Sequence, residues 1–191
     1  MILILDMDMG NLQSVANAVY NAGFDVEIAS DQSKFAEATH LILPGVGSFP
    51  TAMNRLQRNG LFSNVKDFAS SGRPVMGDKT DGLDIIPGSV DRIAMSTGFP
   101  VPHVGWNSVE LKRKDHPVFE KVKSGLDFYF VHSYKFDCEV SSDQLATTDY
   151  SSEVTAIVGR KNIIGFQFHP EKSQINGLRL IENFCNWDGK C

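Results

Sequence analysis

The N-terminal half of the chain alternates short apolar runs with segments of helical periodicity. Four runs predict strands, and an unbroken apolar run such as the first is typical of a strand buried on both faces of a sheet: residues 2–5, 24–28, 40–43 and 74–76. Four segments predict helices: residues 12–20, 31–38, 51–58 and 61–69. Asn11 can cap the first helix and Gly23 can end it. This alternation predicts an α/β fold with a doubly wound, mostly parallel sheet.

The second half has a different pattern, made of short candidate strands. These lie at Ile93 and Val104 and in residues 108–111, 128–131, 145–148, 154–158 and 163–168. The last two segments, joined by residues 159–162, predict a hairpin, so part of this region is antiparallel. An amphipathic helix at 177–187 follows. Without a linker or repeat, we expect one domain over residues 1–191, in which the sheet has an antiparallel extension.

Composition excludes several classes of function. The 191 residues are 42% hydrophobic and carry a net charge of −5 without a dense Lys/Arg cluster, which argues against nucleic acid as a partner. The first apolar run is too short for a signal peptide and no run approaches a membrane span, so the expected location is the cytoplasm. Three cysteines without paired spacing suggest neither a disulfide framework nor a zinc site. No metal or other cofactor is expected.

The loop after residues 40–43 is rich in glycine. Its sequence, Pro44-Gly45-Val46-Gly47-Ser48-Phe49, follows the carboxyl end of a strand, where ligands gather in open parallel sheets. Glycines let the backbone approach a ligand and leave amide groups able to face an oxyanion. On this motif alone, a strand-to-helix turn that needs glycine for its dihedral angles is the favoured interpretation.

A second loop pairs an imidazole with a carboxylate. The stretch at 165–171 alternates as a strand and then delivers His169 and Glu171, with Pro170 stiffening the turn between them. An imidazole activates a thiol or hydroxyl when a second group fixes its tautomer, and Glu171 is close enough in sequence to do so. The alternative is a surface histidine beside a solvated glutamate.

Six stretches occur along the chain in an order shared with one enzyme family: residues 4–15, 43–49, 86–90, 103–107, 129–134 and 165–173. They resemble the class I, triad-type glutamine amidotransferases, whose fold is flavodoxin-like. Pro-His-x-Gly-Trp-Asn at 102–107 and Tyr-Phe-Val-His-Ser-Tyr at 129–134 narrow the resemblance to the glutaminase subunit of imidazole glycerol phosphate synthase. The resemblance implies glutamine as substrate and a cyclase barrel as partner.

The resemblance also implies roles for individual residues. His169 would be the general base and Glu171 the acid that orients it. The oxyanion site would be formed by Gly45, Val46 and Gly47. The glutamine pocket would be bordered by His132, Ser133 and Tyr134. The interface through which ammonia passes to the cyclase would include Gly105, Trp106 and Asn107.

One departure from the family decides what we expect of the chemistry. Family members place a Gly-x-Cys-x-Gly elbow and a helix directly after the strand that ends here at Gly77. This chain continues with Asp78-Lys79-Thr80-Asp81-Gly82 and resumes the family pattern at Leu83. The nucleophile and its helix are missing, so we predict that glutamine hydrolysis is lost. Losing the helix should also uncover apolar surface or force a rearrangement. A smaller departure is Asp6-Met7-Asp8, where the family has Asp-Tyr-Gly.

Three functional hypotheses follow. The first is a glutamine amidotransferase subunit of imidazole glycerol phosphate synthase, in histidine biosynthesis, that lacks glutaminase activity. The second is a non-catalytic docking or regulatory subunit of a cyclase-like partner, including one in surface-polysaccharide sugar amidation. The third is a chain that folds poorly. None of Cys138, Cys185 and Cys191 lies in an elbow, so none is expected to replace the missing thiol.

Overall fold

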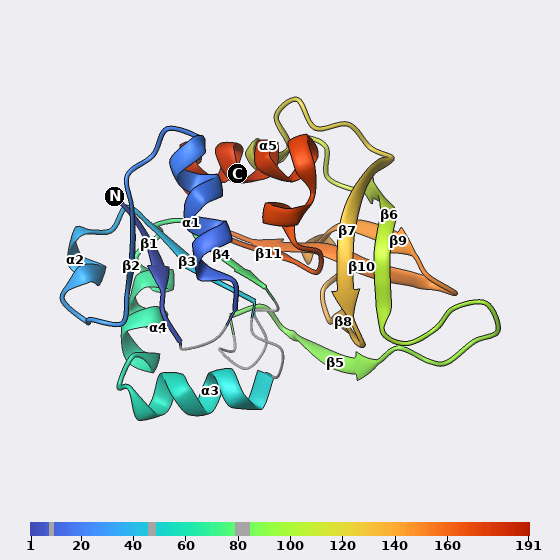
Figure 1. The fold of residues 1–191 in the computed structure, drawn as a ribbon, viewed down its shortest axis with the longest axis horizontal. Helices are drawn as coiled ribbons and strands as arrows, with labels where there is room; N and C mark the ends of the chain where they lie inside the picture. The colour runs from blue at the N-terminus through green and yellow to red at the C-terminus, as the bar shows by residue number, and fades with distance from the viewer. Residues whose placement is uncertain (8–9, 46–48, 79–84) are drawn as a thin grey trace.

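The structure, a computed structural model, describes residues 1–7, 10–45, 49–78 and 85–191. Its main feature is a nine-stranded sheet with the order β2-β1-β3-β4-β11-β10-β9-β6-β7 (Figure 1). The first five strands in this order are parallel: β2 (Val26–Ala29), β1 (Ile2–Leu5), β3 (His40–Leu43), β4 (Val75–Asp78) and β11 (Ile163–Phe166). The other four are antiparallel: β10 (Glu153–Arg160), β9 (Gln144–Asp149), β6 (His103–Leu111) and β7 (Leu126–His132). The predicted α/β class, with its antiparallel extension, is confirmed.

Helices cover both faces of the parallel half. On one face lie α1 (Leu12–Asn21) and α5 (Gln174–Asn186), and on the other lie α2 (Lys34–Glu37), α3 (Phe49–Arg58) and α4 (Phe62–Ser70) (Figure 1). Alternate residues of β1 point into two cores: Ile2 and Ile4 pack with the α1–α5 side, and Leu3 and Leu5 with the α2–α4 side. Burial on both faces explains why this strand is an unbroken apolar run.

The antiparallel extension folds back over the end of β11. A β-bridge joins Phe130 of β7 to Phe168, two residues past β11, and the rings of Phe128 and Phe168 stack at 4.3 Å between centroids. The backbone N–H of His169 donates to the carbonyl of Tyr129 at 2.9 Å. The sheet therefore curves so that β7 lies against the segment carrying His169.

The turn between β10 and β11 locks these strands to the parallel half. Asn162, which is 5% exposed, donates from Nδ2 to the carbonyls of Ala69 and Arg73 at 2.8 and 2.6 Å. Its own carbonyl accepts from the N–H of Val75 at 2.9 Å. One side chain thus ties α4, β4 and β11 together at the amino edge of the parallel strands.

Two strands were not predicted from the sequence. A separate two-stranded sheet pairs β5 (Gly88–Arg92) with β8 (Tyr134–Cys138) in antiparallel register. Every residue of β5 is exposed, so the strand has no apolar alternation for a pattern to reveal. The structure also begins the last helix at Gln174 rather than at 177, after a short 3-10 turn over Pro170–Lys172.

The face beside β4 is packed by residues of β8 and of the segment before β5. Val158 of β10 and Ile163 of β11 are only 6% and 5% exposed, and they share a core with Ile86 and with Phe136 of β8. Phe136 of the small β5–β8 sheet thus packs on this face. No helix of the described chain is long and apolar enough to cross a membrane.

Candidate active site

His169 and Glu171 meet at the carboxyl edge of the parallel strands. His169 Nδ1 lies 3.2 Å from Glu171 Oε1, and the two side chains are 24% and 6% exposed. Because a carboxylate only accepts, Nδ1 carries the proton and Nε2 is left as the basic nitrogen. The turn is fixed from behind, since Ser173 Oγ donates to the His169 carbonyl at 2.6 Å and accepts from the Tyr129 N–H at 2.9 Å. The imidazole is thus fixed in place by its neighbours, unlike a solvated surface histidine.

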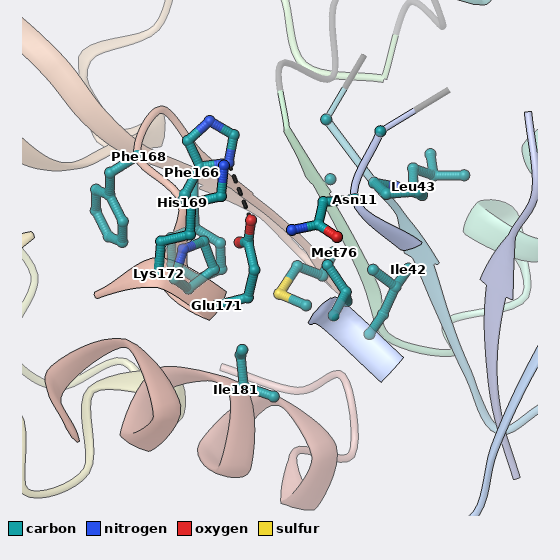
Figure 2. Close-up of a pocket in the computed structure, with 16 residues that line it drawn as sticks. Asn11, Ile42, Leu43, Met76, Phe166, Phe168, His169, Glu171, Lys172 and Ile181 are labelled. Atoms are coloured by element: carbon teal, nitrogen blue, oxygen red, sulfur yellow. Dashed lines mark hydrogen bonds and ion pairs between the residues drawn. The ribbon is translucent and has the colours of Figure 1, made fainter. Parts of the chain in front are cut away.

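A cavity of about 210 Å³ opens in front of this pair (Figure 2). Its walls come from β3, β4, the segment that follows β11, and both helices of one face. The described residues that line it are Gly10, Asn11, Val15, Ile42, Leu43, Pro44, Gly45, Met76, Gly77, Phe166, Phe168, His169, Pro170, Glu171, Lys172 and Ile181. Most of the lining is apolar and the polar groups sit on two sides, as in sites for small molecules.

The first residue of the predicted oxyanion loop lines the cavity. Gly45 lines the cavity, whereas Val46, Gly47 and Ser48 lie outside the described residues. Gly10 has φ +88°, and a Cβ there would lie 2.6 Å from the Gly45 carbonyl oxygen. Only glycine allows the loop after β1 to approach Gly45 this closely. The oxyanion role of Gly45, Val46 and Gly47 stays a prediction.

The end of β4 brings no thiol to the cavity. Met76 and Gly77 line it, the strand ends at Asp78, and residues 79–84, where the break in the family pattern falls, lie outside the described residues. All three cysteines are described and none lines the cavity. Burial raises the pKa of the Cys185 thiol in α5 to about 12, and burial also raises the pKa of Cys191, whose Sγ lies 3.6 Å from the Lys161 carbonyl at the opposite edge of the sheet. A thiol becomes a nucleophile through a lowered pKa, which neither has.

The predicted glutamine-pocket residues lie away from this cavity. His132, Ser133 and Tyr134 join β7 to β8 and are not among the described residues that line it. His132 is 3% exposed, and its ring contacts His103 and the Tyr134 carbonyl rather than His169. Their role in holding glutamine stays a prediction that no contact here supports.

The predicted partner-facing residues lie on an exposed part of β6. Trp106 is 48% exposed and packs edge-to-face on Tyr129 of β7, with 5.8 Å between ring centroids. Val104 and Val131 pair across the same two strands and are 56% and 41% exposed. We call Val104, Trp106, Tyr129 and Val131 the β6–β7 patch. Clustered exposed apolar side chains of this kind mark interaction sites more often than isolated ones do.

Sequence reasoning missed part of the cavity wall. Asn11 was predicted only as a helix cap, and its Oδ1 does accept from the Ser14 N–H at 3.4 Å, yet the residue also lines the cavity opposite Glu171 (Figure 2). The signal that could have found it is its place just past the carboxyl end of β1. Within residues 1–7, 10–45, 49–78 and 85–191, no group of three His, Cys, Asp or Glu side chains could hold a metal ion.

Comparison with known proteins identifies this arrangement. The family model for class I glutamine amidotransferases matches residues 91–186. The imidazole glycerol phosphate synthase subunit HisH of Symbiobacterium thermophilum is 41% identical, over 96% of this chain and 92% of its own length. That of Rhodopirellula baltica is 42% identical, over 96% of both chains.

Solved structures agree on the fold. PurLQS from Thermotoga maritima superposes with a TM-score of 0.79 at 17% identity, over 97% of both chains. At that identity the likeness concerns the fold alone, whereas the relatives at about 40% identity place the chain within a family. The chain belongs to the class I glutamine amidotransferases and, within them, to the group of imidazole glycerol phosphate synthase HisH subunits.

Proposed function

We propose that this chain is the glutamine amidotransferase subunit of an imidazole glycerol phosphate synthase, in histidine biosynthesis, and that it docks on a cyclase subunit without hydrolysing glutamine. Full-length similarity to HisH proteins supports the first half. The second half rests on one observation: His169 and Glu171 line the cavity in hydrogen-bond contact, but none of the three cysteines lines it. The proposed unit is a single domain over residues 1–191 that works in the cytoplasm without a cofactor.

The chemistry that remains follows from the His169–Glu171 pair. In an intact family member the base would deprotonate a thiol, the thiolate would attack the side-chain amide of glutamine, and the oxyanion loop would hold the tetrahedral intermediate. Here Nε2 of His169 can accept a proton, but none of the three cysteines lies in the cavity to donate that proton and form the thioester. Removing a nucleophile that works as a unit with its base costs on the order of a millionfold in rate.

The length of the chain supports a deleted segment. The alignment with the Symbiobacterium protein extends over 198 residues, more than the 191 of this chain, so that relative has positions without a counterpart here. Between Asp78 at the end of β4 and Gly88 at the start of β5 there is room only for residues 79–87. This interval, which contains no cysteine, is where the break in the family pattern falls.

The β6–β7 patch supports docking. Val104, Trp106 and Val131 are exposed on two paired strands, and the half-buried Tyr129 contacts the segment of His169 through its backbone carbonyl. The same patch favours the second candidate function, a non-catalytic subunit that holds a cyclase-like barrel while free ammonia supplies the nitrogen. The variant in sugar amidation differs in the identity of that barrel.

Docking and hydrolysis can be tested in one experiment. The purified chain is mixed with a cyclase subunit and its ribonucleotide ligand, and co-elution and glutamate release from glutamine are both measured against an intact HisH. We expect co-elution without glutamate. Trp106→Ala should weaken docking about tenfold or more, as truncation of a central aromatic does, whereas Tyr20→Ala, on an aromatic 72% exposed in α1, should leave it unchanged. Failure to co-elute would refute docking, and glutamate release near the control rate would refute the loss of chemistry.

A further inference from the structure

Two buried histidines face each other between the β6–β7 patch and the start of β8. His103 and His132 are directly opposite in the β6–β7 pairing and each is 3% exposed. His103 Nδ1 lies 2.8 Å from His132 Nε2. The cavity at His169 uses neither ring. Buried polar groups are retained with satisfied partners, so the hydrogen bonds around this pair define its state.

The neighbours fix which nitrogen of each ring carries the proton. His132 Nδ1 lies 2.8 Å from the Tyr134 carbonyl, which can only accept, so this nitrogen is protonated. In the neutral ring, His132 Nε2 is then the acceptor, and His103 Nδ1 must donate to it. His103 Nε2 in turn accepts from Asn107 Nδ2 at 3.4 Å. The bonds run in one direction, from Asn107 through both histidines to Tyr134.

The side-chain amide of Asn107, where this series of hydrogen bonds begins, cannot flip without losing hydrogen bonds. Asn107 Nδ2 also donates to the Asp149 carbonyl at 2.9 Å, and Asn107 Oδ1 accepts from the Ser108 N–H at 2.9 Å. A flipped amide would set an oxygen against a carbonyl and an NH₂ against an N–H. The fixed amide of Asn107 thus donates to His103 Nε2, which agrees with the tautomers that the Tyr134 carbonyl requires, and the hydrogen bonds at both ends favour the same state.

Packing and burial fix the ring of His103 and favour its neutral form. His103 stacks on Tyr150, at 3.7 Å between centroids and 18° between planes, and on Phe130 at 4.8 Å and 16°. Burial lowers the pKa of His103 to about 4. A proton added to Nε2 of either ring would bring two donors face to face, so the geometry also favours two neutral rings.

The two ends of this hydrogen-bond series, Asn107 and Tyr134, belong to different parts of the molecule. Asn107 is in the stretch beside the β6–β7 patch, and Tyr134, one of the predicted glutamine-pocket residues, begins β8. We propose that His103 is a positioning residue that couples Asn107 to the Tyr134 segment, so that a partner contacting the β6–β7 patch alters the backbone there. The part that concerns a partner rests on the proposed function.

The coupling can be tested first in the isolated chain. Nitrogen-15 NMR of the histidine rings should find the proton on Nδ1 of both His103 and His132 at neutral pH. Asn107→Leu should shift the ring signals of His132, and the same change should have no effect on His132 in a His103→Phe background, where the ring still stacks but donates no hydrogen bond. His116→Phe, at a buried histidine elsewhere, serves as the control and should leave the coupling intact.

Each outcome decides the proposal. A proton on Nε2 of either ring, or a His132 signal that ignores Asn107→Leu, overturns it, and the tautomer measurement needs no variant to fold. Adding a cyclase subunit should then move the Tyr134 amide signal in the wild-type chain and not in His103→Phe. If the cyclase binds neither chain, the proposed docking fails, while the Asn107→Leu comparison still decides the coupling.

Discussion

Replacing Gly177 by alanine should destabilise the protein, although alanine is the better helix former. Gly177 is in the first turns of α5, where a Cβ would collide with the carbonyl oxygen of Pro170 and lie 2.7 Å from the Ser173 Cβ. Pro170 lies between His169 and Glu171, so the collision falls on the turn that holds the base and its acid. Gly177→Ala thus tests how α5 positions the candidate site.

Two opposing effects set the magnitude. Alanine gains about 1 kcal/mol over glycine in a helix interior. Forcing extra volume into a packed site costs about 1–3 kcal/mol, and a clash with backbone belongs at the upper end. The expected net loss is about 2 kcal/mol, which at about 2–4 °C per kcal/mol for a chain of this size lowers the melting temperature by about 4–8 °C.

Thermal and urea unfolding measure this loss, and the ring signals of His169 report the turn. Ser63→Ala, at an exposed position of α4, is the matched control and should change stability by less than about 0.5 kcal/mol. The reasoning is refuted if Gly177→Ala is as stable as the wild type, or more stable, with unchanged His169 signals. That result would mean that the Pro170 turn moves at no cost and is not fixed by α5.

Two further stability predictions follow. Asn162→Ala removes the donor to one buried and one partly buried carbonyl and should cost about 2–6 kcal/mol in urea unfolding, at about 1–3 kcal/mol for each group left unsatisfied. A cost below about 1 kcal/mol would contradict its proposed locking role. Burial lowers the pKa values of His103 and His116 from 6.5 to about 4. Between these pH values the two histidines are protonated in the unfolded chain but neutral in the folded one. Their contribution to stability is complete above about pH 6.5 and is lost as the pH falls towards 4, and unfolding curves of a His103→Phe, His116→Phe double variant should show a shallower decline over that interval.

The parallel half of the fold was predictable because its strands are buried on two faces. The runs at 2–5 and 40–43 match β1 and β3 to the residue, since burial on both sides demands apolar side chains throughout. β5 and β8 escaped prediction because they form a separate two-stranded sheet, and Gly88–Arg92 is exposed along its length. β5 therefore gives no periodic signal, whereas β8 alternates Tyr134, Phe136 and Cys138 with two charged residues, a period-2 signal that could have found it.

The candidate site was predictable where its residues are neighbours in sequence. His169 and Glu171 are two positions apart, and the structure places Nδ1 and Oε1 at 3.2 Å. The pair His103 and His132 is 29 positions apart and becomes visible only through the β6–β7 register. Gly10 likewise shows its role only when the loops after β1 and β3 are seen in contact. The spacing of residues in the sequence can reveal a pair such as His169 and Glu171, whereas a pair that meets across two strands can be found only from the three-dimensional structure.

The most direct measurement is the release of glutamate from glutamine by two proteins, each in complex with a cyclase subunit. One is this chain, and the other is a variant in which residues 78–82 are replaced by the elbow and helix of an intact relative. The account predicts no release by the unaltered chain and release by the restored one, lost again when His169→Ala is added. Release by the unaltered chain at a rate comparable to that of the restored variant would contradict it, because a nucleophile outside the elbow would then be at work.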